Sequence, residues 1–226
     1  MVEYDISNNS EYASLFKDKI GINDNVVAIK FFDDESEIHQ GITKAQPVRH
    51  CEMVKLASKG ESFYSTKDEQ TCKGGSAALG LEDAPKKVAS GEKYFELGRF
   101  KSLEDGKIVA DNLCKISTRH KGLIYAPLKD AEFVPDVIVY FTNPLGGMRT
   151  AQAYVYQYSE KFEPNFSGIQ SVCGDVCATP IESGKPNITL GCDGSRRAAK
   201  VKDEELAVGI NQSEIVSFAE AVEKIF

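Results

Sequence analysis

Cysteine is the residue type most able to do chemistry in this 226-residue sequence. The chain carries six: Cys51, Cys72, Cys114, Cys173, Cys177 and Cys192. Three glycine-containing segments hold half of them, namely Cys72-Lys73-Gly74-Gly75, Cys173-Gly174-Asp175 and Gly191-Cys192-Asp193-Gly194. Glycine lets backbone amides approach a ligand closely, and amide N–H groups stabilise the sulfides of an iron–sulfur cluster. Metal or cluster binding is therefore the first chemistry to consider.

The spacing of the cysteines is not in itself a metal-site signature. There is no Cys-x-x-Cys pair, and only Cys173 and Cys177 are close in sequence. Asp175 and Asp193 stand near two of the thiols, where a carboxylate would compete with them for a metal. The chain has only three histidines, which leaves few imidazoles for a histidine-rich metal site or a Ser-His-Asp arrangement.

Two other interpretations of the cysteines stay open. Any one of them can be an ordinary small hydrophobic residue of the core. Cys173 and Cys177, four residues apart on a predicted helix, could form a redox pair near the helix start, where the helix dipole lowers the pKa of a thiol. That spacing is poor for a low-strain disulfide.

The net charge of -7 disfavours attraction to nucleic-acid phosphates or to anionic membranes. We therefore expect small molecules or a redox partner protein as partners, with no nucleic acid and no membrane. The N-terminal residues 1–5 are polar and acidic, unlike a signal peptide, and no apolar run approaches the roughly 20 residues that span a bilayer. The prediction is a cytoplasmic protein with reduced thiols rather than disulfides.

Hydrophobic patterning predicts helices and strands in alternation. Helices are expected over residues 12–20, 48–59, 85–89 and 150–156, from about residue 169, and from about 213 to the C-terminus. Strands are expected over 26–32, 122–126, 137–141 and 187–192. Residues 127–135 are too few for a usual helical crossover, so strands 122–126 and 137–141 are either antiparallel neighbours or occupy different sheet positions.

Neither a repeat nor a flexible linker divides the chain. The expectation is one domain over residues 1–226, with a mixed sheet and flanking helices. Its class is α/β, with α+β as the alternative.

A series of short motifs in this sequence resembles the DUF169 family. The motifs are Arg49-His50-Cys51-Glu52, Cys72-Lys73-Gly74-Gly75, Leu79-Gly80-Leu81, Ala126-Pro127-Leu128, Pro135-Asp136-Val137, Cys173-Gly174-Asp175, Gly184-Lys185-Pro186-Asn187 and Gly191-Cys192-Asp193-Gly194-Ser195-Arg196. The resemblance extends from about residue 22 to the C-terminus and is specific as a series. The family is uncharacterised and occurs mainly in archaea and anaerobic bacteria.

The resemblance implies which cysteines matter. Cys51, Cys72, Cys173 and Cys192 match recurrent family motifs, whereas Cys114 and Cys177 look like additions. Four thiolates are the number that a [4Fe–4S] cluster needs, so we expect these four to hold one air-sensitive cluster with a redox, sensing or substrate-binding role. Zinc is the alternative metal, although structural zinc usually takes cysteines two to four apart and these are separated by 21, 101 and 19 positions.

The competing class of function is a zinc-stabilised or metal-free module that binds a small anion. Arg149 and Arg196 follow glycine-containing segments and are the predicted anion-binding side chains. His50 and Glu52 flank Cys51 as candidate polar partners of the site, and no residue is assigned a catalytic role. A homo-oligomer is expected only because a neighbouring subunit would shield an exposed cluster.

Overall fold

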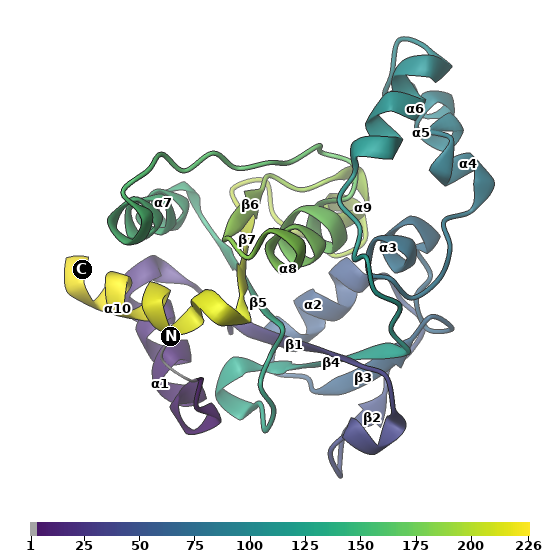
Figure 1. Cartoon of the computed structure of the whole chain (residues 1–226). Coiled ribbons are helices and arrows are strands. Elements are labelled where there is room, and N and C mark those ends of the chain that lie inside the picture. The colour runs from purple at the N-terminus through teal and green to yellow at the C-terminus, as the bar shows by residue number, and fades with distance from the viewer. Residues whose placement is uncertain (1–3) are drawn as a thin grey trace.

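A seven-stranded mixed sheet forms the centre of the computed structural model, which describes residues 4–226 (Figure 1). The strands lie in the order β2-β3-β4-β1-β5-β7-β6, and only β2 and β3 are parallel neighbours. Their bounds are β1 (Val27–Phe32), β2 (Thr43–Lys44), β3 (Phe63–Thr66), β4 (Gly122–Pro127), β5 (Val137–Thr142), β6 (Asn187–Thr189) and β7 (Leu206–Asn211). The expected single domain with a mixed sheet and flanking helices is confirmed.

The strand β1 lies between β4 and β5 and is antiparallel to both. Ile29 is paired with Tyr125 on one side and with Val137 on the other. The two strands that the short segment 127–135 connects therefore occupy different positions in the sheet. The aliphatic and aromatic runs of all three strands are fully buried because helices cover both faces of the sheet.

One face of the sheet is covered by α1 (Asn9–Phe16), α7 (Pro144–Tyr158) and α10 (Ile215–Ile225). Alternate strand residues such as Ala28, Phe32 and Tyr140 point to these helices, as the period of two in a strand requires. The α1 helix continues into a short π-helix, η2 (Lys17–Gly21), and ends at Gly21 with φ +83°, as predicted.

The opposite face carries shorter helical segments: α2 (His50–Ser58), α3 (Lys73–Ala78), the π-helix η5 (Ser171–Ala178), α8 (Thr179–Ser183) and α9 (Asp193–Arg197). The intervening strand residues, including Ile29, Tyr125 and Val139, pack against this layer. We call it the cysteine face, because four of its helical segments begin at or close to a cysteine.

The helices α4 (Lys86–Ala89), α5 (Glu92–Glu96) and α6 (Leu103–Asn112) form a small projection beside α3, which we call the arm (Figure 1). Gly91 and Gly106 make its tight packing possible, since a Cβ atom at Gly91 would lie 2.1 Å from the carbonyl carbon and oxygen of Gly106. Gly91 also has φ +75°, which glycine adopts at little cost.

Within the described part of the chain, no helix is long and apolar enough to cross a membrane.

Candidate functional site

Cys51, Cys72, Cys173 and Cys192 all line one cavity on the cysteine face. They reach it from four different segments: α2, the residue before α3, η5 and the residue before α9. Each of the four side chains is partly buried, and the cavity has a volume of about 250 Å³. The structure thus brings together the four cysteines that match the family motifs, although up to 101 positions separate successive members of the set in sequence.

All four cysteines stand at the beginning of a helix. Cys72 and Cys192 are the residues that precede α3 and α9, and Cys51 and Cys173 lie in the first turns of α2 and η5. The first N–H groups of a helix have no partner within it and carry partial positive charge. The helix starts thus place partial positive charge near the thiols, although burial still raises the pKa of Cys51 and Cys173.

Two glycines bring the thiols close to backbone. A Cβ atom on Gly75 would lie 3.4 Å from Sγ of Cys173 and 3.7 Å from Sγ of Cys72, so these two thiols meet over the first turn of α3. A Cβ atom on Gly194 would lie 3.5 Å from Sγ of Cys192 and 3.1 Å from Nη1 of Arg49. Both glycines therefore lie against the thiols at ordinary van der Waals distance.

The thiols influence one another's ionisation. Burial, together with the neighbouring Cys192 and Cys72, raises the pKa of Cys51 to about 12. Burial and the other three thiols also raise the pKa of Cys173. Cys192 differs: burial would raise its pKa, but hydrogen bonds from Ser171 and Ser195 outweigh burial and lower it. If these thiols lost their protons, their negative charges would repel one another. A bound metal takes the place of the protons, and its positive charge offsets that repulsion.

Cys177 and Cys114 do not line the cavity. Cys177 is fully buried in the apolar core, and burial raises the pKa of its thiol. Both thiols are free, as are the other four. Although Cys173 and Cys177 are four residues apart in η5, one faces the cavity and the other the core. Their surroundings give no support to the redox-pair interpretation.

The carboxylates near the cysteines have other partners. Oδ2 of Asp175 accepts a hydrogen bond of 2.7 Å from Oγ1 of Thr189, and burial raises the pKa of Asp175 to about 6. Asp193 forms an ion pair with Arg99, whose Nε lies 3.0 Å from Oδ2. The predicted competition of these carboxylates for a metal is thus weakened by the contacts that hold them.

Among residues 4–226, no three or more His, Cys, Asp or Glu side chains are arranged to hold a single metal ion.

The two arginines predicted to grip an anion are engaged elsewhere. Nη1 of Arg149 donates to the carbonyl of Lys19 at 2.8 Å, and its guanidinium lies over the ring of Phe226. Arg196 donates to backbone carbonyls, including that of Glu205 at 2.9 Å. Neither lines the cysteine cavity.

Other basic residues do line it, and sequence reasoning missed them. They are Arg49, Lys93, Arg99 and Arg197. Lys93 lies in α5 of the arm and Arg99 in the loop between α5 and α6, so no local motif connects them to the cysteines. Arg49 stood in a quoted motif, but only the fold shows which way it faces.

The arm is held to the cavity wall by two polar contacts. Nε2 of Gln170 donates to the hydroxyl of Tyr94 at 3.1 Å, and Arg99 pairs with Asp193 at the start of α9. Burial raises the pKa of Tyr94 to about 12, with a further contribution from the cavity thiols. The arm therefore forms one wall of the cysteine cavity.

His50 lines the cavity and is part of a buried polar network. Its Nδ1 is 2.9 Å from the hydroxyl of Tyr125, which also accepts from Nε2 of Gln70 at 3.2 Å. Burial lowers the pKa of His50 to about 3, so the ring is neutral. Nε2 makes no hydrogen bond of ordinary geometry, although the Val172 backbone lies close to it. His50 supports the wall of the site rather than supplying a proton at neutral pH.

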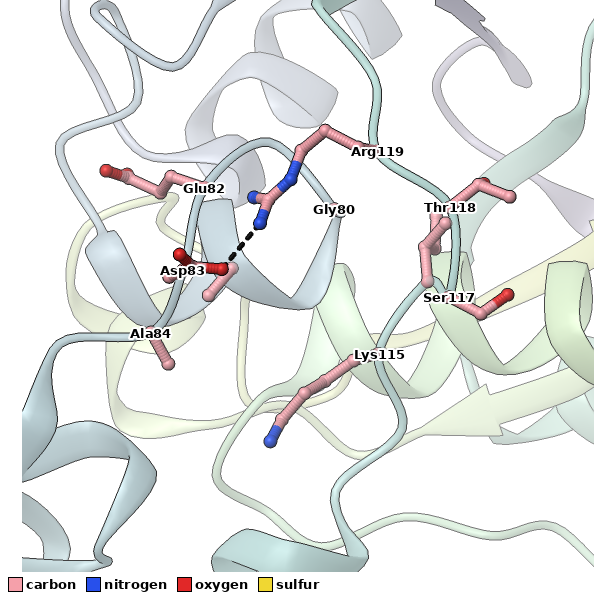
Figure 2. A pocket seen from close by; sticks show the side chains of 10 residues that line it. Gly80, Glu82, Asp83, Ala84, Lys115, Ser117, Thr118 and Arg119 are labelled. Atoms are coloured by element: carbon pink, nitrogen blue, oxygen red, sulfur yellow. Dashed lines mark hydrogen bonds and ion pairs between the residues drawn. The ribbon is translucent and has the colours of Figure 1, made fainter.

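A second hollow lies at the other end of α3 (Figure 2). It is lined by Glu82, Asp83, Lys115 and Arg119 among others, and Arg119 forms an ion pair with Asp83 across it. Its charges are mixed and no cysteine lines it. It offers no comparable chemistry.

Comparison with known proteins agrees with the motifs. The model of the DUF169 family, described as "Uncharacterised ArCR", matches residues 15–221. An uncharacterised protein of Methanocaldococcus jannaschii is 36% identical over 222 residues, which cover 97% of this chain and 95% of the relative. No solved structure matches the chain at a significant level.

Proposed function

The chain belongs to the DUF169 family, and we propose that it is an iron–sulfur protein in which Cys51, Cys72, Cys173 and Cys192 hold one [4Fe–4S] cluster. The observation that carries the proposal is the meeting of these four thiols in one cavity. A cubane cluster takes one thiolate on each of its four irons. Cys114 and Cys177 are left out of the ligand set because they do not line that cavity.

The shape of the site favours a cluster over zinc. A tetrahedral zinc ion lies about 2.3 Å from each sulfur, so its four sulfurs must come within about 4 Å of one another. In the part of the chain that the structure describes, no cysteine group has a single-ion arrangement. The cavity of about 250 Å³ is also smaller than the roughly 300–1,000 Å³ of most organic-ligand pockets. A compact group larger than one ion suits it better.

The electrostatic surroundings support an anionic group. Four thiolates outweigh the positive charge of a [4Fe–4S] core, so the bound assembly is negative. Helix starts face it, and Gly75 and Gly194 leave room for it beside their backbones. Arg49 lies against the first turn of α9 and adds positive charge.

Full cysteine ligation favours electron transfer or redox sensing over catalysis at an open iron. With a thiolate on each iron, no iron keeps a free position for substrate. The cluster, when bound, would supply one-electron redox chemistry, and the chain's own residues would set its potential through burial and hydrogen bonds to sulfur. Ser171 and Ser195, which hydrogen-bond to Cys192, are placed to do this. Such a role requires a redox partner and a reducing compartment, which we take to be the cytoplasm.

The test is metal and sulfide analysis of protein produced and purified without oxygen. We expect about four iron and four acid-labile sulfide per chain, with brown colour that bleaches in air. One zinc per chain, or no metal in protein that was also offered iron and sulfide, would overturn the proposal.

Serine variants assign the ligands. Replacing Cys51, Cys72, Cys173 or Cys192 by Ser should reduce bound iron by more than half, because an iron loses its thiolate. Cys114→Ser is the matched control and should keep the full iron content and spectrum, since Cys114 is outside the cavity. Equal iron loss in the control and the four variants would contradict the assignment.

A further inference from the structure

We propose that the mouth of the cysteine cavity binds a small oxyanion that carries a hydrogen-bond donor, such as a hydrogen phosphate or a hydroxy acid. Arg49, Lys93 and Arg197 would hold its charge, and Gln170 would accept its donor. The inference deepens the proposed function, since it rests on the same cavity and places a ligand beside the cluster.

The first support is the local charge. The whole chain has a net charge of -7, yet four basic side chains and one carboxylate line this cavity in the described structure. Basic residues gathered around a hollow in an acidic protein raise the local concentration of anions there. The hollow at the other end of α3 has no such excess, because two acidic side chains, Glu82 and Asp83, and two basic ones, Lys115 and Arg119, line it (Figure 2).

The second support is that three of these cations lack a carboxylate partner. Arg99 is paired with Asp193, but Arg49, Lys93 and Arg197 form no ion pair with any described residue. Arg197 makes only a long contact of 3.4 Å from Nε to the carbonyl of Asp193. Guanidinium groups bind planar carboxylates and phosphates through paired hydrogen bonds. Their charge is therefore available to a ligand.

The third support is a buried polar group with unused capacity. Gln170 lines the cavity, is only 4% exposed, and donates through Nε2 to Tyr94. Its Oε1 has no hydrogen-bond partner in the described residues. A buried acceptor left unpaired costs free energy, on the order of 1–3 kcal/mol. A ligand hydroxyl or amine would satisfy it, which is why the ligand should carry a donor.

The site also joins two parts of the molecule. Arg49 immediately precedes α2 and Arg197 is the last residue of α9, whereas Lys93 belongs to the arm. An anion at the mouth would bridge the arm and the helical layer and add to the two contacts that already join them. The alternative is that these three basic side chains only neutralise the negative charge of the cluster. In that case the protein would show no affinity for an added anion.

The experiment is calorimetric titration of anaerobically purified protein, as it is isolated, with inorganic phosphate at low ionic strength. We expect saturable binding at one site. Sulfate has the same shape and charge but no donor at neutral pH, and it should bind at least tenfold more weakly if Gln170 accepts from the ligand. Arg197→Gln and Lys93→Gln should each weaken phosphate binding about tenfold or more, the loss expected for one charged hydrogen bond.

Two matched controls test whether position, rather than total charge, matters. Lys101→Gln removes an exposed arm lysine outside the cavity, and Arg119→Gln removes an exposed arginine from the second hollow. Both should leave phosphate affinity unchanged. Circular dichroism should show all variants folded. Absence of saturable binding, or equal weakening in variants and controls, would overturn the inference.

The outcome is separable from that of the cluster proposal. Iron and sulfide are measured on the same samples. Colourless, metal-free protein whose phosphate binding depends on Arg197 would reject the cluster and keep the anion site. Protein with a full cluster and no saturable phosphate binding would reject the anion site and keep the cluster.

Discussion

The two faces of the sheet share the same strands but are covered in different ways. On one face, α7 and α10 are 15 and 11 residues long and pack apolar side chains against the strands. On the cysteine face, α2 has nine residues, and α3 and α9 have six and five. Many short helices give many helix starts, and four of those on this face stand beside a thiol.

The faces differ also in how their polar groups are satisfied. Among the described residues, buried side-chain atoms that have neither a hydrogen bond nor an ion pair include His50 Nε2, Gln70 Oε1 and Gln170 Oε1. All belong to segments that lead into or form the cysteine face. Native interiors rarely leave such atoms unpaired without a functional reason. The contrast fits the proposals above, in which one face mainly stabilises the fold and the cysteine face would hold the cluster and the anion.

Phe218→Ala should show the largest effect on stability. Phe218 is 1% exposed in the core under α10. Its truncation leaves a cavity and should lower the free energy of unfolding by about 3–5 kcal/mol, measured by urea denaturation. Iron per folded chain should stay unchanged. Loss of iron from the folded variant would show that the two faces are not independent.

Removal of the cluster should loosen one face only. Ligand binding stabilises the native state, and the cluster would hold α3, η5 and α9 together. In cluster-free protein, amide hydrogen exchange in those segments should be faster by about 100-fold, while exchange in β5, β7 and α10 changes little. Uniform acceleration across the sheet would contradict the division of roles.

Two buried tyrosines provide the smallest and most closely matched comparison. Tyr125 and Tyr140 are both 0% exposed, on opposite faces of the sheet. Tyr125→Phe leaves Nδ1 of His50 without its partner and should cost about 1–3 kcal/mol. Tyr140→Phe should cost about 1 kcal/mol or less, because Thr150 keeps its hydrogen bond to the carbonyl of Gly146.

Urea denaturation of the metal-free forms of both tyrosine variants measures the difference. If Tyr140→Phe proved the more damaging substitution, the cysteine face would not depend on its buried polar network in the way we infer.

Several elements followed from local sequence. The apolar residues of β1, β4 and β5 are numerous enough to predict these strands from local sequence. In α10, the spacing of the apolar residues predicts which side of the helix is buried. The strand β7 was missed, since its Gly209 weakens the strand pattern. Only the fold explains that glycine: a Cβ atom there would lie 1.9 Å from the carbonyl oxygen of Val176 in η5.

The sequence by itself determined the number of thiols, the glycines around them and, through the family motifs, the four that we propose as ligands. It could not show that they meet, because contacts between segments 19 to 141 positions apart depend on strand order and helix placement. Only the tertiary structure shows that Cys173 lines the cavity and Cys177 does not. It also shows that Arg149 and Arg196 bind backbone carbonyls outside the cavity, and that the arm forms one of the cavity walls. Local patterns record which side of one element is buried, whereas a site is made where several elements meet.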